Sequence, residues 1–216
     1  MGPPGAGKGT QAKRVADKFE MSHLSSGDIF RAEKASGSDL GKKLAEYMNA
    51  GLLVPDETVV DVMAAAITKN SAAGGLLLDG FPRTVPQADA LDKQLAKAGK
   101  PLDAVVVITA DDEEIVTRIC WRRSCPKCGK IYHVKYMPPK SGNACDEDGT
   151  ELSQRSDDKE DVVRQRLAAY YKQTESVIAY YRSQGLVKVL EVDGMASPDD
   201  VTKKMVEALE KSQGAR

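Results

Sequence analysis

The sequence contains no apolar run long enough to cross a membrane. A membrane helix needs about 20 consecutive apolar residues, and every apolar stretch here is much shorter. The first residues are rich in glycine and proline, so we expect neither a membrane span nor a signal peptide. Cysteine is absent outside residues 120–145. Because a disulfide framework would spread its cysteines along the chain, this clustering favours a local metal site in a reducing, cytoplasmic compartment.

The sequence also lacks an excess of charge of either sign. It has 31 Lys and Arg against 32 Asp and Glu, and only three Phe and one Trp. A nucleic-acid-binding surface usually shows a basic excess with aromatic residues for stacking, so we expect no nucleic-acid partner and no membrane partner. Any anionic ligand must then be bound by a local group of cations. Only two histidines occur, His23 and His133, and no Ser/His/Asp or Cys/His arrangement indicates nucleophilic catalysis.

Continuous apolar runs alternate with amphipathic segments along the chain. The runs at 75–80, 104–110 and 186–194 are typical of strands buried on both faces. Helical patterns fall at 8–18, 29–49 (interrupted, so two short helices), 55–67, 111–123, 158–183 and from Ser197 onward. This alternation predicts an α/β fold with a parallel sheet flanked by helices. Residues 124–158 lose apolar periodicity and are interpreted as a metal-stapled insertion.

The stretch GPPGAGKGT at residues 2–10 has the spacing of a phosphate-binding loop. Its glycines allow successive backbone N–H groups to converge on phosphates, and Lys8 is placed to reach the outer phosphate oxygens. The general pattern has Ser or Thr directly after the lysine, whereas here Gly9 intervenes before Thr10. The alternative is a glycine-rich turn that happens to contain a lysine.

Two further stretches place polar residues next to predicted elements. In DGFPRT (79–84), Asp79 lies at the carboxyl end of a predicted strand, where open α/β sheets bind ligands. In SSGDIFR (25–31), Ser25 or Ser26 precedes a predicted helix. Each alone is also explained as an ordinary turn or helix cap. Seven arginines lie near the ends of predicted elements or at loop boundaries, and they are Arg31, Arg83, Arg118, Arg122, Arg123, Arg155 and Arg166. Phosphoryl transfer needs such fixed cations and little acid–base chemistry.

The cysteines have the spacing of two metal-binding knuckles. Cys125-x-x-Cys128 is followed after sixteen residues by Cys145-x-x-Asp148, which predicts one tetrahedral structural zinc site. Competing fourth ligands are Asp146, Glu147 and His133, and free thiols in a flexible segment are the alternative. Cys120 lies outside the pattern and is interpreted as a packed small apolar residue.

Taken together, these motifs resemble the adenylate kinases in their long form with a zinc-bearing lid. The residues that carry the resemblance are 2–11, 23–31, 79–87, 115–123, 125–148 and 155–167. The resemblance implies the reaction MgATP + AMP ⇌ 2 ADP without a covalent intermediate, and partners ATP, AMP and ADP. It also implies a monomer with a P-loop core at 1–24, 55–120 and 159–216, a small helical AMP-binding insertion at 25–54 and a lid at 121–158.

The resemblance also implies a role for each matching residue. ATP would be bound by Gly5, Ala6, Gly7, Lys8, Gly9, Thr10, Arg118, Arg122, Ile131, Tyr132 and His133. AMP would be bound by Ser26, Arg31, Leu52, Leu53, Val54, Gly80, Phe81, Pro82, Arg83, Gln87, Arg155 and Arg166. The catalytic set would be Lys8, Arg83, Arg122, Arg155 and Arg166. Asp79 would support Mg²⁺, Asp157 and Asp158 would steady lid closure, and Cys125, Cys128, Cys145 and Asp148 would bind Zn²⁺.

Two alternatives differ in function. A sister nucleoside monophosphate kinase would take UMP or CMP as acceptor or GTP as donor, and Ser26 stands where many adenylate kinases have threonine beside the AMP base. Gln87 and the long lid favour AMP. The more distant alternative is a zinc-ribbon nucleic-acid-binding module attached to a degenerate phosphate loop, which the near-neutral charge disfavours.

The phosphate loop follows directly on Met1, although such a loop normally follows a buried strand. Burying four apolar side chains of such a strand contributes roughly 6–12 kcal/mol, which rivals the stability of a whole domain, about 5–15 kcal/mol. We therefore expect that the first strand is missing from this sequence and that the natural protein carries a short apolar strand before the loop.

Overall fold

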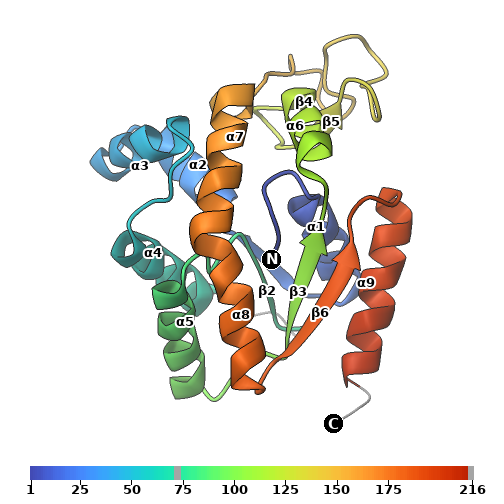
Figure 1. Ribbon diagram of the computed structural model, residues 1–216. Helices are drawn as coiled ribbons and strands as arrows, with labels where there is room; N and C mark the ends of the chain where they lie inside the picture. Colours follow the sequence, from blue (N-terminus) through green and yellow to red (C-terminus); the bar gives the residue numbers. More distant parts are fainter. Residues whose placement is uncertain (71–73, 214–216) are drawn as a thin grey trace.

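The computed structural model describes residues 1–70 and 74–213. Its core strands form two parallel pairs (Figure 1). Strand β1 (Ser22–Ser25) pairs with β2 (Leu76–Asp79), and β3 (Ala104–Thr109) pairs with β6 (Lys188–Asp193). The predicted α/β class with parallel strands is confirmed, and all three apolar runs form strands.

Helices cover both faces of the β3–β6 pair. Side chains alternate between the two faces of a strand, and Val106 and Ile108 pack in one apolar cluster with residues of α1 (Lys8–Lys18) and α9 (Pro198–Gln213). Val105 and Val107 pack in another cluster with residues of α5 (Val85–Lys97) and α8 (Glu175–Gln184). The continuous apolar run at 104–109 therefore reflects burial on both faces, as its pattern predicts.

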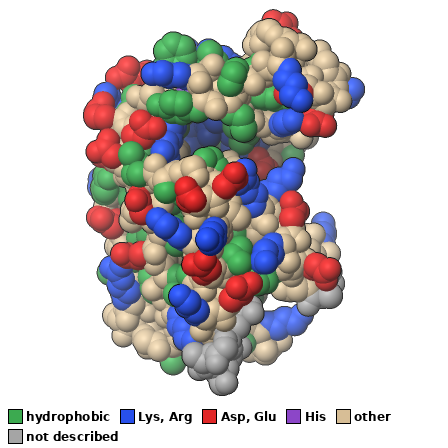
Figure 2. Space-filling view, turned by 90° about the vertical axis from the view of Figure 1, so that its right-hand side faces the viewer, with side chains coloured by type: hydrophobic (Ala, Val, Ile, Leu, Met, Phe, Trp, Pro, Cys, Tyr) green, Lys and Arg blue, Asp and Glu red, His purple; other side chains and the backbone are tan. Residues whose placement is uncertain are grey.

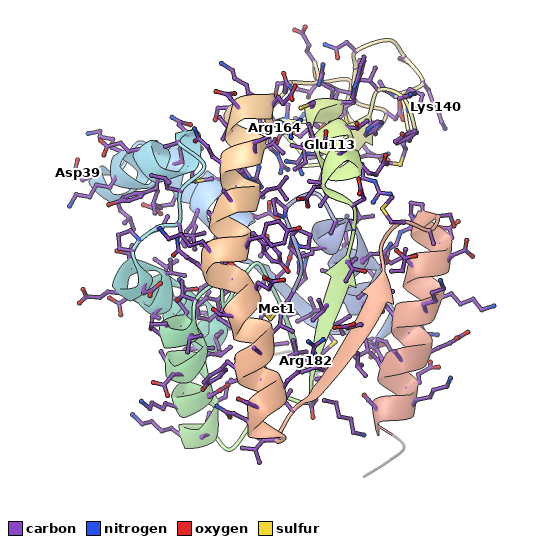
Figure 3. The ribbon with its side chains drawn as sticks, viewed as in Figure 1. Met1, Asp39, Glu113, Lys140, Arg164 and Arg182 are labelled. Carbon is purple, nitrogen blue, oxygen red and sulfur yellow. The ribbon has the colours of Figure 1, made fainter. Side chains whose placement is uncertain are left out.

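Met1 holds the start of the phosphate loop against β3. Its amino group donates a hydrogen bond to the Val106 carbonyl, and its carbonyl accepts one from Ile108 N–H at 3.0 Å. Figure 3 shows Met1 beside this strand. The expectation of an apolar strand before the loop stays a prediction.

The interrupted pattern between residues 26 and 49 forms two helices, as predicted. Helix α2 (Ser26–Ser36) ends at Gly37, and α3 (Asp39–Asn49) begins after Ser38, whose hydroxyl accepts a hydrogen bond from Gly41 N–H. The two helices pack closely, because a Cβ atom on Gly41 would lie 2.3 Å from the Glu33 carbonyl oxygen. Helix α4 (Asp56–Lys69) follows and connects this insertion to β2.

The helix predicted over 111–123 is shorter than expected. Helix α6 (Asp112–Cys120) ends at Trp121, and Arg122 and Arg123 belong to β4 (Arg122–Ser124). Strand β4 pairs in antiparallel fashion with β5 (Ile131–His133). The basic residues suited the last turn of a helix, but pairing with β5 satisfies their backbone groups instead. This pairing lies at the base of the lobe drawn at the top of Figure 1, which we call the upper lobe.

The long helix predicted over 158–183 is divided. A single turn, η1 (Ser156–Asp158), precedes α7 (Glu160–Ala169), and a π-helical turn, η2 (Tyr170–Thr174), joins α7 to α8. A π turn changes which side chains face the core along an otherwise continuous helix. The Arg164 guanidinium on α7 pairs with Glu113 on α6 at 2.9 Å (Figure 3), which ties α7 to the helix that leads into β4. No helix within residues 1–70 and 74–213 is both long and apolar enough to cross a membrane.

Candidate active site

The phosphate loop ends at the N-terminus of α1. Gly7 precedes that helix with φ of 89°, a left-handed conformation that favours glycine. The Lys8 ammonium donates hydrogen bonds to the carbonyls of Gly2 at 2.8 Å and Pro3 at 2.6 Å. The lysine is therefore folded back over the loop, beside the backbone N–H groups that begin α1, an arrangement suited to binding an anion.

The surroundings of Lys8 disfavour its positively charged form. Burial is the main reason that its pKa is lowered to about 7, and the positive charges of Arg83, Arg166 and Arg122 lower it further. Asp79 opposes the shift only in part. An anion bound in the loop would restore the charge on Lys8.

Burial and mutual repulsion also lower the pKa values of the neighbouring arginines. Burial, followed by the charge of Arg166, lowers the pKa of Arg83 to about 10, and burial with Arg122 and Arg31 lowers that of Arg155 to about 10. Burial also lowers the pKa of Arg166, against the pull of Asp157. These cations come from separate segments of the chain, and such mutual repulsion is relieved by a polyanionic ligand. The basic side chains visible inside the recess of Figure 2, below the upper lobe, agree with this arrangement.

Three carboxylates border this cation cluster. Asp79, at the end of β2, lies 3.6 Å from His23 Nε2. Burial alone would raise the pKa of Asp79, but His23 and Lys8 outweigh burial and lower it. Asp157 pairs with Arg166 at 2.9 Å, and Asp158 accepts two hydrogen bonds from Arg122. A carboxylate at the end of a parallel strand is well placed to hold a hydrated cation.

Residues 80–87 are held by hydrogen bonds of their own. The Gly80 carbonyl accepts from the Ser26 hydroxyl and from Arg83 Nε, both at 2.7 Å. Gln87 is buried, with its carbonyl oxygen 2.8 Å from Arg83 N–H and its amide nitrogen 2.7 Å from Asp56. The Gln87 amide thus fixes the backbone of the loop at Arg83.

The other residues expected at the acceptor side lie in this loop, after α3 and on α2. Phe81 is buried, and the Phe81–Pro82 peptide bond is cis. Leu52, Leu53 and Val54 follow α3, with Leu52 exposed and Val54 buried. Arg31, on α2, pairs with Asp28.

The lid side brings together residues of α6, β4 and β5. Arg118 bonds to Glu114 at 2.9 Å and to the Gly194 carbonyl at 2.8 Å. The pKa of His133 is lowered, mainly by burial, and Arg118 contributes. The backbone N–H groups of Lys135 and Tyr136 donate to His133 Nδ1, and the two rings of His133 and Tyr136 stack 4.4 Å apart.

Two features of this side escaped sequence reasoning. The Tyr132 side chain points into the cysteine cluster and is 1% exposed, so it is not free to contact a ligand. Gly194, which follows β6, bonds to Arg118 and brings its loop to the site. The Asp-Gly pair at the carboxyl end of a buried strand was a usable signal, because open α/β sheets bind ligands there.

The cysteine cluster forms a candidate metal centre. The ligand atoms of Cys125, Cys128, Cys145 and Asp148 all lie within 4.8 Å of one another. The sulfur atoms of Cys128 and Cys145 are 3.6 Å apart, close to the edge of about 3.8 Å in a zinc tetrahedron with Zn–S bonds of about 2.3 Å. The donor set and spacing therefore fit zinc.

None of the competing fourth ligands belongs to this group of four. Asp146 accepts a hydrogen bond from Lys140 N–H, Glu147 pairs with Lys130, and His133 uses Nδ1 for backbone donors. Asp148 is the carboxylate beside the three sulfurs, and Cys120 lies outside the group. The observed contacts favour Asp148.

Comparisons with known proteins place these features in one family. The sequence model of the family described as adenylate kinase matches residues 1–186. An adenylate kinase of Archaeoglobus fulgidus is 47% identical over 211 residues, covering 98% of this chain and 96% of that protein. One from Streptomyces coelicolor is 49% identical over 214 residues, with coverage of 99% and 98%. One from Acetivibrio thermocellus is 48% identical over 209 residues, with coverage of 97% and 95%.

Proposed function

This chain belongs to the adenylate kinase family, and on that premise we propose how its residues carry the reaction. The activity is reversible phosphoryl transfer between ATP and AMP. An oxygen of the AMP phosphate forms the new P–O bond as the bond from the transferred phosphorus to the ADP leaving oxygen breaks, and two ADP result. No side chain forms a covalent intermediate.

One observation carries the assignment of residues: cations from separate segments converge closely enough to lower one another's pKa. Positioning and charge neutralisation are the main tasks in phosphoryl transfer. We assign Lys8, with the N–H groups of Gly5–Thr10, to the ATP phosphates. Arg83 and Arg31 are assigned to the AMP phosphate. We assign neutralisation of the transferring group to Arg122, Arg155 and Arg166. Arg155 and Arg166 are also assigned contacts with AMP.

The nucleosides occupy opposite sides of this cluster. We assign the AMP base to the neighbourhood of Ser26 and residues 52–54. The AMP-side loop is assigned to residues 80–87, in which Gln87 holds the backbone at Arg83. The ATP base side is assigned to Arg118, His133 and the backbone of residues 131–132. Closure of the lid excludes water, which would otherwise hydrolyse the transferring group. We assign Asp157 and Asp158, which pair with Arg166 and Arg122, to steadying that closure.

Mg²⁺ enters with ATP, where it neutralises charge on the phosphate oxygens. Asp79 fits a role in holding its hydration shell, because the carboxylate lies against the loop: a Cβ atom on Gly9 would be 3.5 Å from Asp79 Oδ2. Zn²⁺ fits the cluster of Cys125, Cys128, Cys145 and Asp148, where four protein ligands indicate a structural role.

The proposed division of the chain is a core of 1–24, 55–120 and 159–216, an AMP-binding insertion of 25–54 and a lid of 121–158. The two helices of the insertion and the β4–β5 pair of the lid support it. We also propose a cytoplasmic location, which the free cysteines of the described chain support, and a monomeric state. Sedimentation in the absence of nucleotide measures the oligomeric state.

A coupled assay with AMP, UMP and CMP, each against ATP and GTP, tests the substrates. We expect AMP with ATP to give the largest kcat/KM. A larger value for UMP or CMP would overturn the assignment of the acceptor, and a larger value for GTP would overturn that of the donor. Ser26→Thr serves as the matched variant for acceptor choice, because it keeps the hydroxyl that bonds to Gly80.

A further inference from the structure

Tyr132 connects the cysteine cluster to strand β5. Its side chain is 1% exposed and packs with Cys125, Cys145 and Leu152. Its neighbours in β5 are Ile131 and His133. Because side chains alternate along a strand, the tyrosine points into the metal knuckle while its two neighbours point to the other face.

One of the two hydrogen bonds at the Tyr132 hydroxyl has a fixed direction. The backbone N–H of Asp146 can only donate, and it lies 2.7 Å from the tyrosine oxygen. The tyrosine must therefore direct its own proton elsewhere, and Cys145 Sγ lies 3.3 Å from the same oxygen. In the Tyr132–Cys145 pair either atom can donate, and when the sulfur is a thiolate, the form that binds a metal, the tyrosine hydroxyl is the donor.

We propose that Tyr132 is a positioning residue that couples metal binding at the cysteine cluster to ATP binding at β5. Strand β5 has three residues, and its register places Arg122 opposite His133. A shift of Cys145 on metal loss is transmitted through the tyrosine to this short strand, and from it to His133 and Arg122. The ATP half of this inference rests on the proposed function of those two residues.

The first arm of the test measures the metal alone. Zinc-loaded wild type and Tyr132→Phe are mixed with a colorimetric chelator, and zinc release and affinity are recorded without nucleotide. Loss of a hydrogen bond to a metal ligand typically weakens metal affinity 10–100-fold, and we expect that range for Tyr132→Phe. Tyr181→Phe is the matched control, because Tyr181 is also 1% exposed and its hydroxyl bonds to Asp92 at 3.3 Å, far from the lid. Unchanged affinity in Tyr132→Phe, or an equal loss in Tyr181→Phe, would overturn the proposal.

The second arm measures the coupling by equilibrium binding of ATP in excess Mg²⁺. Removal of zinc from the wild type is expected to raise the Kd for ATP at least fivefold and to leave the Kd for AMP unchanged. In Tyr132→Phe the Kd for ATP no longer depends on zinc. The coupling is contradicted if the Kd of the wild type for ATP does not change with zinc. It is also contradicted if the Kd of Tyr132→Phe for ATP depends on zinc as strongly as that of the wild type.

A third measurement needs no variant, so it stands even if Tyr132→Phe fails to fold. Coupling between two sites is reciprocal, so ATP must tighten zinc binding by the factor by which zinc tightens ATP binding. Zinc affinity of the wild type is therefore expected to rise at least fivefold with saturating ATP and not with AMP. An ATP effect equal to that of AMP would refute the coupling. The coupled assay tests the proposed function separately. If no ADP forms while the zinc affinities measured without nucleotide still differ as expected, the proposed function fails and the role of Tyr132 at the metal stands.

Discussion

The Arg122 guanidinium and the Asp158 carboxylate form an ion pair with two hydrogen bonds, one of them from Nε to Oδ2 at 2.9 Å. Arg122 begins β4, and Asp158 ends η1, so the pair joins the two ends of the segment between them. Burial alone would lower the pKa of Arg122, but its hydrogen bonds to Asp158 and the negative charge of Asp158 outweigh burial and raise it. The pair therefore keeps one arginine of the cluster charged and fixed at the base of the upper lobe.

Asp158→Ala is expected to lower the free energy of unfolding by about 3–5 kcal/mol, because it leaves the partner of a buried ion pair uncompensated. The Asp158 side chain is 0% exposed, and that of Arg122 is 18% exposed. Urea denaturation followed by circular dichroism measures the change. Asp61→Ala, at an exposed position in α4, is the control, with an effect within about 0.5 kcal/mol. Similar midpoints for the two variants would contradict the role of the pair.

Binding of MgATP is expected to take up most of a proton per site at pH 8 and much less at pH 6. The pKa of Lys8 is lowered to about 7, mainly by burial, so the lysine is largely neutral at pH 8 and regains its proton beside the phosphates. Calorimetry in buffers of different ionisation enthalpy measures the uptake. Lys8→Met should abolish the uptake and lower kcat about 10²–10³-fold. Equal uptake by the variant would assign the proton to another group.

The lowered pKa of Lys8 also predicts how the free energy of unfolding changes with pH. The folded chain releases the Lys8 proton near pH 7, whereas the unfolded chain keeps it to about its ordinary value of 10.5. The unfolded state binds more protons between these values, so stability from this group rises with pH across that window. Lys8→Met should flatten this part of the curve of unfolding free energy against pH, and a curve with the same slope in both proteins would contradict the shift.

Local patterns predicted what depends on local chemistry. The apolar runs of β2, β3 and β6 and the start of α1 at Lys8 follow from burial on both faces and from a glycine-rich loop. The α2–α3 break was readable because Gly37 and Ser38 are end and start signals of helices. The motif residues expected around the phosphates are also the ones whose charges interact in the structure.

Features that depend on distant partners were not predictable in the same way. Arg122 and Arg123 joined a strand because β5 supplies backbone partners. The direction of the Tyr132 side chain depends on Cys145, thirteen residues away along the chain. The contact of Arg118 with Gly194 spans 76 residues. In each case the deciding interaction is tertiary and leaves no periodicity in the sequence.

Gly80→Ala is expected to lower kcat/KM for AMP about 10–100-fold. Gly80 has φ of +72°, and a Cβ atom there would lie 2.9 Å from Ser26 Oγ and 3.0 Å from Arg83 Nη2. The added methyl displaces the arginine, and a misplacement of about 1 Å can cost about 10²-fold in rate. Steady-state kinetics with AMP varied at saturating ATP measures the effect.

Gly142→Ala is the matched control for that substitution. Gly142 has φ of +59°, but no heavy atom lies within 4 Å of the position of its Cβ. Both variants carry the backbone strain of about 1–3 kcal/mol, and only Gly80→Ala moves Arg83. An equal loss of kcat/KM in the two proteins would show that strain and not displacement is responsible.

Metal analysis of the purified chain is expected to give one zinc per molecule, and chelation is expected to expose three thiols. In the zinc-loaded protein only Cys120, which is outside the cluster, should react promptly with a thiol reagent, whereas all four cysteines should react after chelation. Zinc at a hundred times its Kd stabilises by about 2.7 kcal/mol, which corresponds to about 5–10 °C in Tm for a chain of this size. Cys145→Ser should lose that increment, and Cys120→Ser should retain it. A chain without zinc whose Tm is indifferent to chelator would contradict the site.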